Sequence, residues 1–359
     1  MLVSIILFIL VFSLVALAHE LGHFWAARYF GVAVDEFGIG LPPRLWQKEG
    51  RDLKISIGSI PIGGYVRLRS SEGRKRLDPK SLEVQTPFVK MVVSLAGVFM
   101  NLVLAFVIFF FGFLVGMPPL ASSIQELPTA RAETEKVVVM GIRQGSPADR
   151  AGIKVGDYIL KIGEETVLTP EKISEITAGS AGALLRILVE REGEELTIET
   201  RPELLEGRGS LGVMIDSSIS KAHYAWWATP YLALVETART TTAVGKGFVG
   251  LFAKLFTKGE LAPELTGPVG IARIAGEMAS LGIFRFLQFI ALLTINLALI
   301  NIIPLPALDG GRFVFASLEA ISRRRFRAEV ENLIHLAGFL LIIVLVVFIT
   351  YRDVLRFFQ

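Results

Sequence analysis

The segment LVSIILFILVFSLVALAHELGH, residues 2–23, decides the fold. Its run from Leu2 to Ala18 carries no charge and only two serines, which predicts the start of a membrane-spanning helix. No positive charge precedes the run and apolar residues resume at Phe24, so we do not interpret it as a cleaved signal peptide. Ionisable residues in such a segment are costly, and they indicate a functional site.

The ionisable residues lie in His19-Glu20-Leu21-Gly22-His23, which has the H-E-x-x-H spacing of zinc peptidases. Residues i and i+4 share one helix face, so both imidazoles can turn toward one ion. Glu20 then lies beside the first ligand, where it can accept a proton from a bound water. In a soluble chain this pattern is often a coincidence on a solvated face. At the end of an apolar span, these ionisable side chains lack solvation by water unless they bind a ligand. We therefore expect one Zn²⁺ per chain.

Composition indicates a polytopic membrane protein with an inserted polar domain. The 359 residues are 52% hydrophobic, with a mean hydropathy of +0.56, but 20% are charged. Because the chain has no cysteine, disulfides, thiolate zinc sites and a cysteine nucleophile are excluded. The net charge of +3 is too small to indicate nucleic-acid binding.

Four long apolar segments are expected to cross the membrane, at residues 2–27, 88–116, 284–305 and 333–350. Twelve Lys and Arg residues lie between the first two, from Arg28 to Lys90. A second basic cluster lies between the last two, from Arg323 to Arg327. The positive-inside rule therefore predicts that both basic loops are cytoplasmic, with both termini and segment 117–283 outside.

A catalytic zinc ion usually has three protein ligands and a water, so a third ligand is required at the depth of His19. Asp309 and His335 both qualify by their depth, whereas His223 lies on the outer side. The surrounding PLPALDGG, residues 304–311, favours Asp309, because irregular backbone at membrane depth is tolerated where it lines a cavity. The alternative is a simple helix stop before a cytoplasmic loop. Asn296 and Asn301 add polar groups near the same level, for neighbouring helices or for substrate backbone.

Loop 31–87 contains two segments typical of strands, residues 53–57 and 65–69, and we predict a turn at residues 61–64 between them. A strand edge beside a protease site can hold an extended substrate by backbone hydrogen bonds. We therefore expect Gly63, Gly64 and Tyr65 to contact substrate. The alternative is an ordinary cytoplasmic hairpin.

Segment 122–216 is polar, rich in predicted strands and of the size of one small domain. Strands are expected at residues 136–140 and 184–189, and a short helix at residues 171–177. Residues 145–160, GSPADRAGIKVGDYIL, resemble a PDZ domain. Leu211, Gly212 and Val213 would then line its peptide groove, although a purely steric plug above the active site is an alternative. The following region 217–283 includes an apolar but charge-interrupted segment, residues 224–262, which predicts an amphipathic helix.

Several separated motifs together resemble the site-2 proteases, more closely the bacterial RseP type, here with a single PDZ domain. They are the stretch HELGH at 19–23, FGIG at 37–40, IPIGGYV at 60–66, AGVFMN at 96–101, TGPVGIA at 266–272 and LDGG at 308–311. The resemblance implies that His19, His23 and Asp309 bind zinc, with Glu20 as general base. It also implies that Asn296 and Asn301 hold substrate and that His335 has no role.

The predicted fold class is a polytopic α-helical membrane protein of four transmembrane helices, with a membrane-associated β-hairpin and an inserted α+β PDZ domain. The expected parts are residues 1–116, 122–216, 217–283 and 284–359. By resemblance, the protein would be a zinc endopeptidase of the bacterial inner membrane. It would cleave transmembrane segments of pre-trimmed single-pass proteins, such as anti-sigma factors, or remnant signal peptides. The alternatives are a membrane-bound PDZ adaptor with a non-catalytic metal site and, less well supported, a metal transporter.

Overall fold

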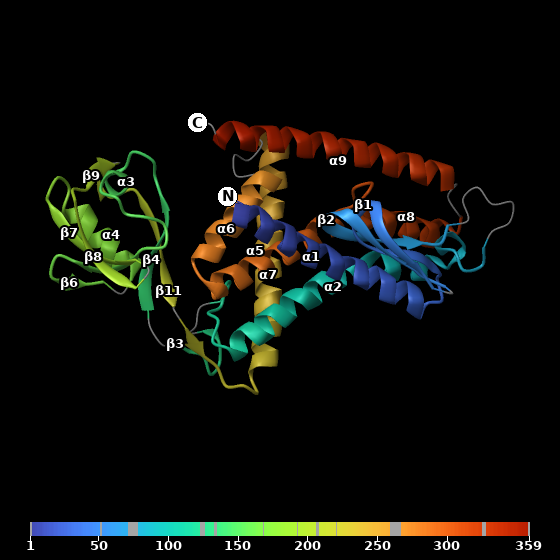
Figure 1. The fold of residues 1–359 in the computed structure, drawn as a ribbon, viewed down its shortest axis with the longest axis horizontal. Helices are drawn as coiled ribbons and strands as arrows, with labels where there is room; N and C mark the ends of the chain where they lie inside the picture. The colour runs from blue at the N-terminus through green and yellow to red at the C-terminus, as the bar shows by residue number, and fades with distance from the viewer. Residues whose placement is uncertain are drawn as a thin grey trace. The chain divides into compact units, whose positions relative to one another are not determined.

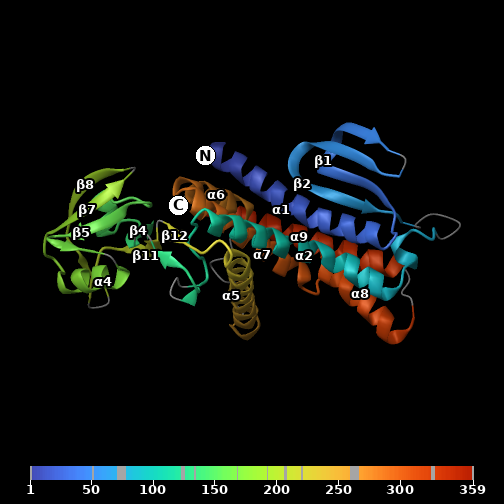
Figure 2. The same cartoon turned by 90° about the horizontal axis from the view of Figure 1, so that it is seen from below.

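The chain forms two compact units in a computed structural model. One unit comprises residues 1–111 and 233–359, and the other comprises residues 112–232. Figures 1 and 2 show the first as long helices with a β-hairpin and the second as a small sheet with short helices. The structure describes residues 2–50, 52–70, 78–122, 126–132, 135–167, 169–191, 193–205, 208–219, 221–258, 267–324 and 328–357. Outside these ranges lie Arg51, Arg74, Lys75, Arg76, Thr266, Arg325 and Arg327, which belong to the basic loops and motifs above.

Among the described residues, four helices are long and apolar enough to cross a membrane. They are α1 (Leu2–Tyr29), α2 (Pro87–Leu114), α7 (Ile283–Ile302) and α9 (Ala328–Phe357). Each contains most of one predicted apolar segment. The third helix ends earlier than expected, at Ile302, because Pro304 has no amide hydrogen and disfavours helical backbone at the residue before it.

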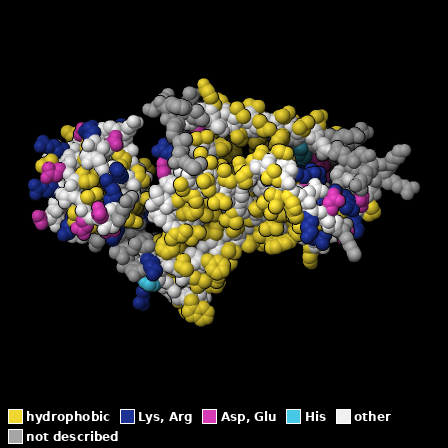
Figure 3. Space-filling view, viewed as in Figure 1, with side chains coloured by type: hydrophobic (Ala, Val, Ile, Leu, Met, Phe, Trp, Pro, Cys, Tyr) yellow, Lys and Arg dark blue, Asp and Glu magenta, His cyan; other side chains and the backbone are white. Residues whose placement is uncertain are grey.

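The outward surface of these helices is apolar. On α9, Leu333, Leu341 and Val344 are each about two-thirds exposed. Figure 3 shows hydrophobic side chains covering most of the visible face of the helical unit, with charged side chains gathered near the end that carries the hairpin. Soluble proteins rarely expose so large an apolar patch, so this surface is suited to lipid. The protein is therefore a membrane protein.

The β-hairpin consists of β1 (Val34–Glu49) and β2 (Lys54–Leu68), which pair antiparallel. Both strands curl, so that Phe37 of β1 pairs with Val66 on one side and with Ile55 on the other. The two predicted strands, residues 53–57 and 65–69, both fall within β2 except for their outer residues 53 and 69. Residues 54–57 pair with residues 36–39 in the parallel sense and residues 64–68 pair with the same stretch in the antiparallel sense, so the chain reverses between the two predicted strands, in the region of the turn predicted at residues 61–64. A further reversal lies between Glu49 and Lys54. Gly63 has a φ of 72° and lies in the reversal between Ile57 and Gly64, where glycine adopts left-handed backbone without strain.

A buried carboxylate cross-links the hairpin. Glu36, only 2% exposed, accepts hydrogen bonds from the Tyr65 hydroxyl at 2.6 Å, the Ser56 hydroxyl at 2.8 Å and the Arg44 guanidinium at 2.7 Å. Burial opposes ionisation of Glu36, but these donors outweigh it and lower the pKa of the carboxyl below its ordinary value. The ionised carboxylate thus ties β1 to β2.

Helices α1 and α2 cross closely, because α1 has a glycine at the crossing. A side chain at Gly22 would overlap the Ala96 carbonyl and Met100 of α2. Toward the other end of α1, Val11 and Val15 pack with Ile290 of α7 in one buried apolar cluster. This close approach brings the histidine face of α1 against α2.

Helix α8 (Asp309–Ser322) begins directly after the turn that follows α7. Gly310 lies against the carbonyls of Ile302 and Ile303, and Gly311 lies against that of Leu305, where any Cβ would overlap backbone. The two glycines therefore allow α8 to fold back onto the end of α7. Asp309 is held in the first turn of α8 as a result.

Helix α6 (Pro268–Ser280) is capped by a residue distant in sequence. Asp353 of α9 accepts hydrogen bonds from the Gly267 and Gly270 amides at 2.8 and 3.1 Å. A carboxylate at a helix N-terminus satisfies free N–H groups and is favoured by the helix dipole. Helix α5 (Thr229–Lys258) coincides with the predicted amphipathic segment and is not among the four candidate spans. Its position relative to a membrane stays a prediction.

The second unit is built on an antiparallel sheet of strand order β11-β4-β5-β7-β8, with β6 paired to β5. The predicted strands at 136–140 and 184–189 fall almost entirely within β4 and β7, and the predicted helix lies within α4. Val137, Ile159 and Ile187 are fully buried at the centre of its core. The bounds are β3 (Arg131–Ala132), β4 (Glu135–Ile142), α3 (Pro147–Arg150), β5 (Tyr158–Ile162), β6 (Glu165–Thr166), α4 (Pro170–Gly179), β7 (Leu185–Arg191), β8 (Glu194–Thr200), β9 (Glu203–Leu205), β10 (Arg208–Ser210), β11 (Val213–Ile219) and β12 (Ala222–His223).

Candidate metal centre

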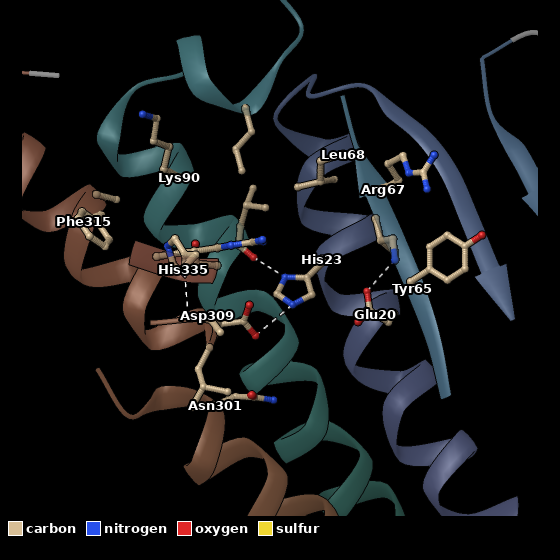
Figure 4. Close-up of a pocket in the computed structure, with 18 of the residues that line it drawn as sticks. Glu20, His23, Tyr65, Arg67, Leu68, Lys90, Asn301, Asp309, Phe315 and His335 are labelled. Carbon is tan, nitrogen blue, oxygen red and sulfur yellow. Dashed lines mark hydrogen bonds and ion pairs between the residues drawn. The ribbon is translucent and has the colours of Figure 1, made fainter. Parts of the chain in front are cut away.

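Three potential metal ligands from two distant helices lie together inside the helical unit. His19 and His23 are on α1, and Asp309 is at the start of α8. The Nε2 atoms of the two histidines are 3.1 Å apart, and they lie 2.8 and 3.3 Å from Oδ2 of Asp309. These three residues are the group among the described residues whose ligand atoms are close enough to share an ion. Figure 4 shows His23 and Asp309 facing each other across the cavity.

The spacing of the donor atoms fits a tetrahedral zinc ion. Zn–N and Zn–O bonds of about 2.0–2.2 Å at tetrahedral angles separate adjacent ligand atoms by roughly 3.3–3.5 Å. The three observed separations of 2.8, 3.1 and 3.3 Å approach this value. Two imidazoles and one carboxylate are also a ligand set typical of catalytic zinc.

Gly97 of α2 leaves the space beside the donor atoms open. A Cβ at this position would lie 2.5 Å from His23 Nε2 and 2.6 Å from His19 Nε2. Any larger residue would therefore place a methyl group against both nitrogens. The donor set and the adjacent space together fit a bound metal ion.

A hydrogen bond to the backbone of α2 orients the imidazole of His23. Its Nδ1 lies 2.7 Å from the Val93 carbonyl, which can only accept a hydrogen bond. Nδ1 of a neutral ring must therefore carry the proton, and Nε2 presents its lone pair to the cavity. Such an outer partner is the usual means of fixing a metal-binding tautomer.

Asn101 of α2 plays the corresponding part for His19. It is fully buried, its Nδ2 lies 3.3 Å from His19 Nδ1, and its Oδ1 has no hydrogen-bond partner among the described residues. A half-turn of the amide exchanges these atoms and lets Oδ1 accept the proton of His19 Nδ1. Val93, Gly97 and Asn101 are four residues apart, so one face of α2 contacts both histidines.

Glu20 lines the same cavity on the side nearest the hairpin (Figure 4). One carboxylate oxygen, Oε2, accepts a hydrogen bond from the Val66 amide of β2 at 2.8 Å. The backbone of β2 thus holds the Glu20 side chain while its other oxygen has capacity to accept a proton. This arrangement suits a general base beside a metal ion.

The cavity has a volume of about 680 Å³ and is large enough for a peptide segment. Its lining combines apolar groups with ionisable ones, including an ion pair between Lys90 and Glu319 at 2.7 Å. Polar groups of this kind can hold water inside an apolar helical protein. Water is the second reactant of any hydrolysis.

Two of the five predicted substrate-binding residues line the cavity, and the other three are not among its lining residues. Asn301 and Tyr65 line the cavity. Asn296 instead donates a hydrogen bond to Leu292 O of its own helix at 2.8 Å. Gly63 and Gly64 lie against α1, where the Gly63 amide donates to the Ser13 hydroxyl and Gly64 leaves no room for a side chain beside Leu17. Their contact with substrate stays a prediction.

The two other histidines are not part of the group formed by His19, His23 and Asp309, which we call the ligand triangle. His335 of α9 lines the cavity, but its Nδ1 accepts a hydrogen bond from the Ala307 amide at 2.8 Å. His223 is in β12 of the second unit. Gly97, Asn101 and Val66 were not predicted as site residues, although all three fall within motifs quoted above.

The predicted peptide groove falls at the junction of β10 and β11. Leu211 is 2% exposed and its side chain belongs to the core of the second unit. Gly212 has a φ of 74° and its amide donates to the Ser210 hydroxyl at 3.1 Å, and Val213 begins β11. Peptide binding by these residues stays a prediction.

Comparison with known proteins identifies the family. Proteins named as zinc metalloproteases in Clostridium acetobutylicum, Clostridium perfringens and Agrobacterium fabrum are 32%, 30% and 31% identical to this chain. Each alignment covers 98% of this chain and 97%, 98% and 95% of the relative. The PDZ domain of an SdrC-like protein from Listeria monocytogenes matches 22% of the chain, but its TM-score of 0.21 is too low to assign the fold of the second unit. The model of peptidase family M50 matches residues 7–345, so the chain belongs to peptidase family M50, the site-2 protease family that its motifs resemble.

Proposed function

We propose that His19, His23 and Asp309 bind the single zinc ion of this protease and that Glu20 is its general base. As a member of family M50, the protein is a zinc-dependent metalloprotease. The observation that carries the assignment is the triangle of ligand atoms beside Glu20, within helices whose outer surface is apolar.

Zinc in such a site acts as a Lewis acid toward a carbonyl and makes water a better nucleophile near neutral pH. Glu20 would take the proton from the attacking water and return it to the leaving amine. Val66 keeps the Glu20 carboxylate in place for both transfers through its amide. Val93 and Asn101 keep the imidazoles turned toward the ion.

The substrates would be transmembrane segments of single-pass membrane proteins, including anti-sigma factors or remnant signal peptides. A helical peptide hides its carbonyl groups, so a substrate must be extended before it is cut. Strand β2 passes beside Glu20, and backbone hydrogen bonds along such a strand are a general means of holding an extended peptide. Asn301, which lines the cavity, would hold the substrate backbone.

The distribution of basic residues supports an orientation with both termini and the second unit outside the cytoplasm, in the inner membrane of a bacterium. The second unit would be a PDZ domain that selects substrates with small outer portions. Its sequence GSPADRAGIKVGDYIL is the basis for this part of the proposal.

Cleavage of a single-pass reporter by the purified protein tests the site. The Glu20→Gln variant should retain one zinc ion and lose cleavage, whereas Asp309→Asn should lose zinc. Glu277→Gln, at a partly exposed position on α6 where Glu277 pairs with Arg273, is the matched control and should behave as wild type. Full turnover by Glu20→Gln, or full zinc content in Asp309→Asn, would contradict the assigned roles.

A further inference from the structure

The position of Asp309 depends on a turn that is unfavourable by itself. Residues 303–308 connect α7 to α8, and Ala307 in this turn has a φ of 76°. This left-handed region is disfavoured for residues with a Cβ, and it persists only where neighbouring groups hold it. Two residues of α9, His335 and Gly338, contact this turn.

His335 of α9 makes the first contact. Its Nδ1 accepts a hydrogen bond of 2.8 Å from the amide of Ala307, the residue with the unfavourable φ. An imidazole that accepts at Nδ1 carries its proton on Nε2, so the ring is neutral. The ring also packs against Phe315 of α8, with centroids 5.6 Å apart. His335 thus joins the turn to both α8 and α9.

Gly338 of α9 makes the second contact, one turn further along the helix. A Cβ at this position would lie 2.5 Å from both Cβ and O of Pro306. Residues 335 and 338 share one helix face. This face of α9 therefore holds two successive residues of the turn, Pro306 by close packing and Ala307 by a hydrogen bond.

We propose that His335 is a positioning residue for the metal site. By holding Ala307, it fixes the turn that delivers Asp309 to the two histidines. The inference rests on the proposed role of Asp309 as a ligand. His335 lines the same cavity as the three proposed ligands, but it acts through the backbone two residues before Asp309, and not as a ligand itself.

Zinc affinity of the full-length protein, measured by chelator competition, tests the proposal. His335→Leu removes the acceptor and should weaken zinc binding about 10-fold or more, as loss of an outer partner of a metal ligand typically does. His335→Asn carries an oxygen near the position of Nδ1 and should stay within about threefold of wild type. Adding Ala307→Gly to His335→Leu should recover part of the loss, because glycine adopts a positive φ without strain.

Leu336→Ala is the control, since the Leu336 side chain is exposed on the same turn of α9 and should leave zinc affinity unchanged. Wild-type affinity in His335→Leu would overturn the proposal, and so would equal losses in His335→Asn and His335→Leu. Gly338→Ala disturbs the same turn without removing the hydrogen bond and should also weaken zinc binding. If His335→Leu does not fold, this variant tests the proposal instead, and wild-type zinc affinity in Gly338→Ala would then overturn it. Wild-type affinity in Asp309→Asn would instead overturn the proposed ligand set.

Discussion

Replacement of Gly97 by alanine is expected to remove zinc from the protease while leaving α2 helical. The added Cβ would lie 2.5 and 2.6 Å from the Nε2 atoms of His23 and His19. Non-bonded heavy atoms need about 3.5 Å, so the imidazoles would have to retreat by roughly 1 Å. Metal–ligand distances tolerate only about 0.2 Å, so the zinc affinity should fall by about 100-fold or more.

The same substitution should stabilise α2 as a helix, so its effect on zinc binding can be separated from any effect on folding. Alanine favours a helix over glycine by about 0.8–1.0 kcal/mol, so loss of zinc could not be attributed to an unfolded α2. Gly112→Ala is the matched control on the same helix, because the atoms nearest to its Cβ belong to the Met117 side chain and not to a proposed metal ligand. A methionine side chain moves easily, so this variant should retain its zinc.

The assay is metal analysis of the purified protein in detergent, followed by chelator competition and thermal unfolding. Gly97→Ala should contain little zinc, and Gly112→Ala should contain one ion per chain. A Gly97→Ala protein with wild-type zinc content and affinity would refute the reasoning. It would mean that the face of α2 at residues 93–101 does not border the ion.

Three further outcomes are expected. Asn101→Leu should weaken zinc binding by about 10- to 100-fold and Asn101→Asp should not, measured by chelator competition, since only the former leaves His19 Nδ1 without an acceptor. Asp353→Ala should lower the free energy of unfolding by about 0.5–2 kcal/mol, the usual effect of losing a helix N-cap, with denaturation in detergent as the measurement. Because the pKa of Glu36 is lowered in the fold, its stabilisation is complete above the ordinary carboxyl pKa of about 4.3 and is lost as pH falls through the lowered value. Limited proteolysis of the hairpin should therefore accelerate in acid for wild type, and the Glu36→Gln variant should lack this acid-dependent step.

The parts of the fold that depend on local pattern could be predicted from the sequence. A helix places residues 19 and 23 on one face whatever surrounds it, and a long apolar run is sufficient to predict a span. Asp309 could also be proposed as a ligand from the sequence, because the distribution of basic residues and the nearby prolines predict that it lies at the same membrane depth as His19. No local pattern, however, shows where α8 folds back on α7.

Features that depend on how elements pack could not be predicted. Gly97 and Asn101 acquire their contacts only from the crossing of α1 and α2 beside Gly22. Gly63 lies in the reversal that the sequence predicts, but no local pattern shows that residues 54–57 and 64–68 both pair with residues 36–39 of β1. Asp353 caps a helix that begins 85 residues earlier in the chain, a contact that spacing alone cannot reveal.

The ligand triangle also has a consequence for the order of events during synthesis. His19 and Asp309 are separated by 290 residues. At a translation rate of about 5–20 residues per second, roughly 15–60 seconds pass between the emergence of the first ligand and the last. During that interval the growing chain lacks Asp309, the proposed third ligand, so on the proposed assignment it would be catalytically silent while its first apolar segments enter the membrane. A protease with the proposed substrates would thereby be unable to act until its first three membrane-spanning segments have been synthesised.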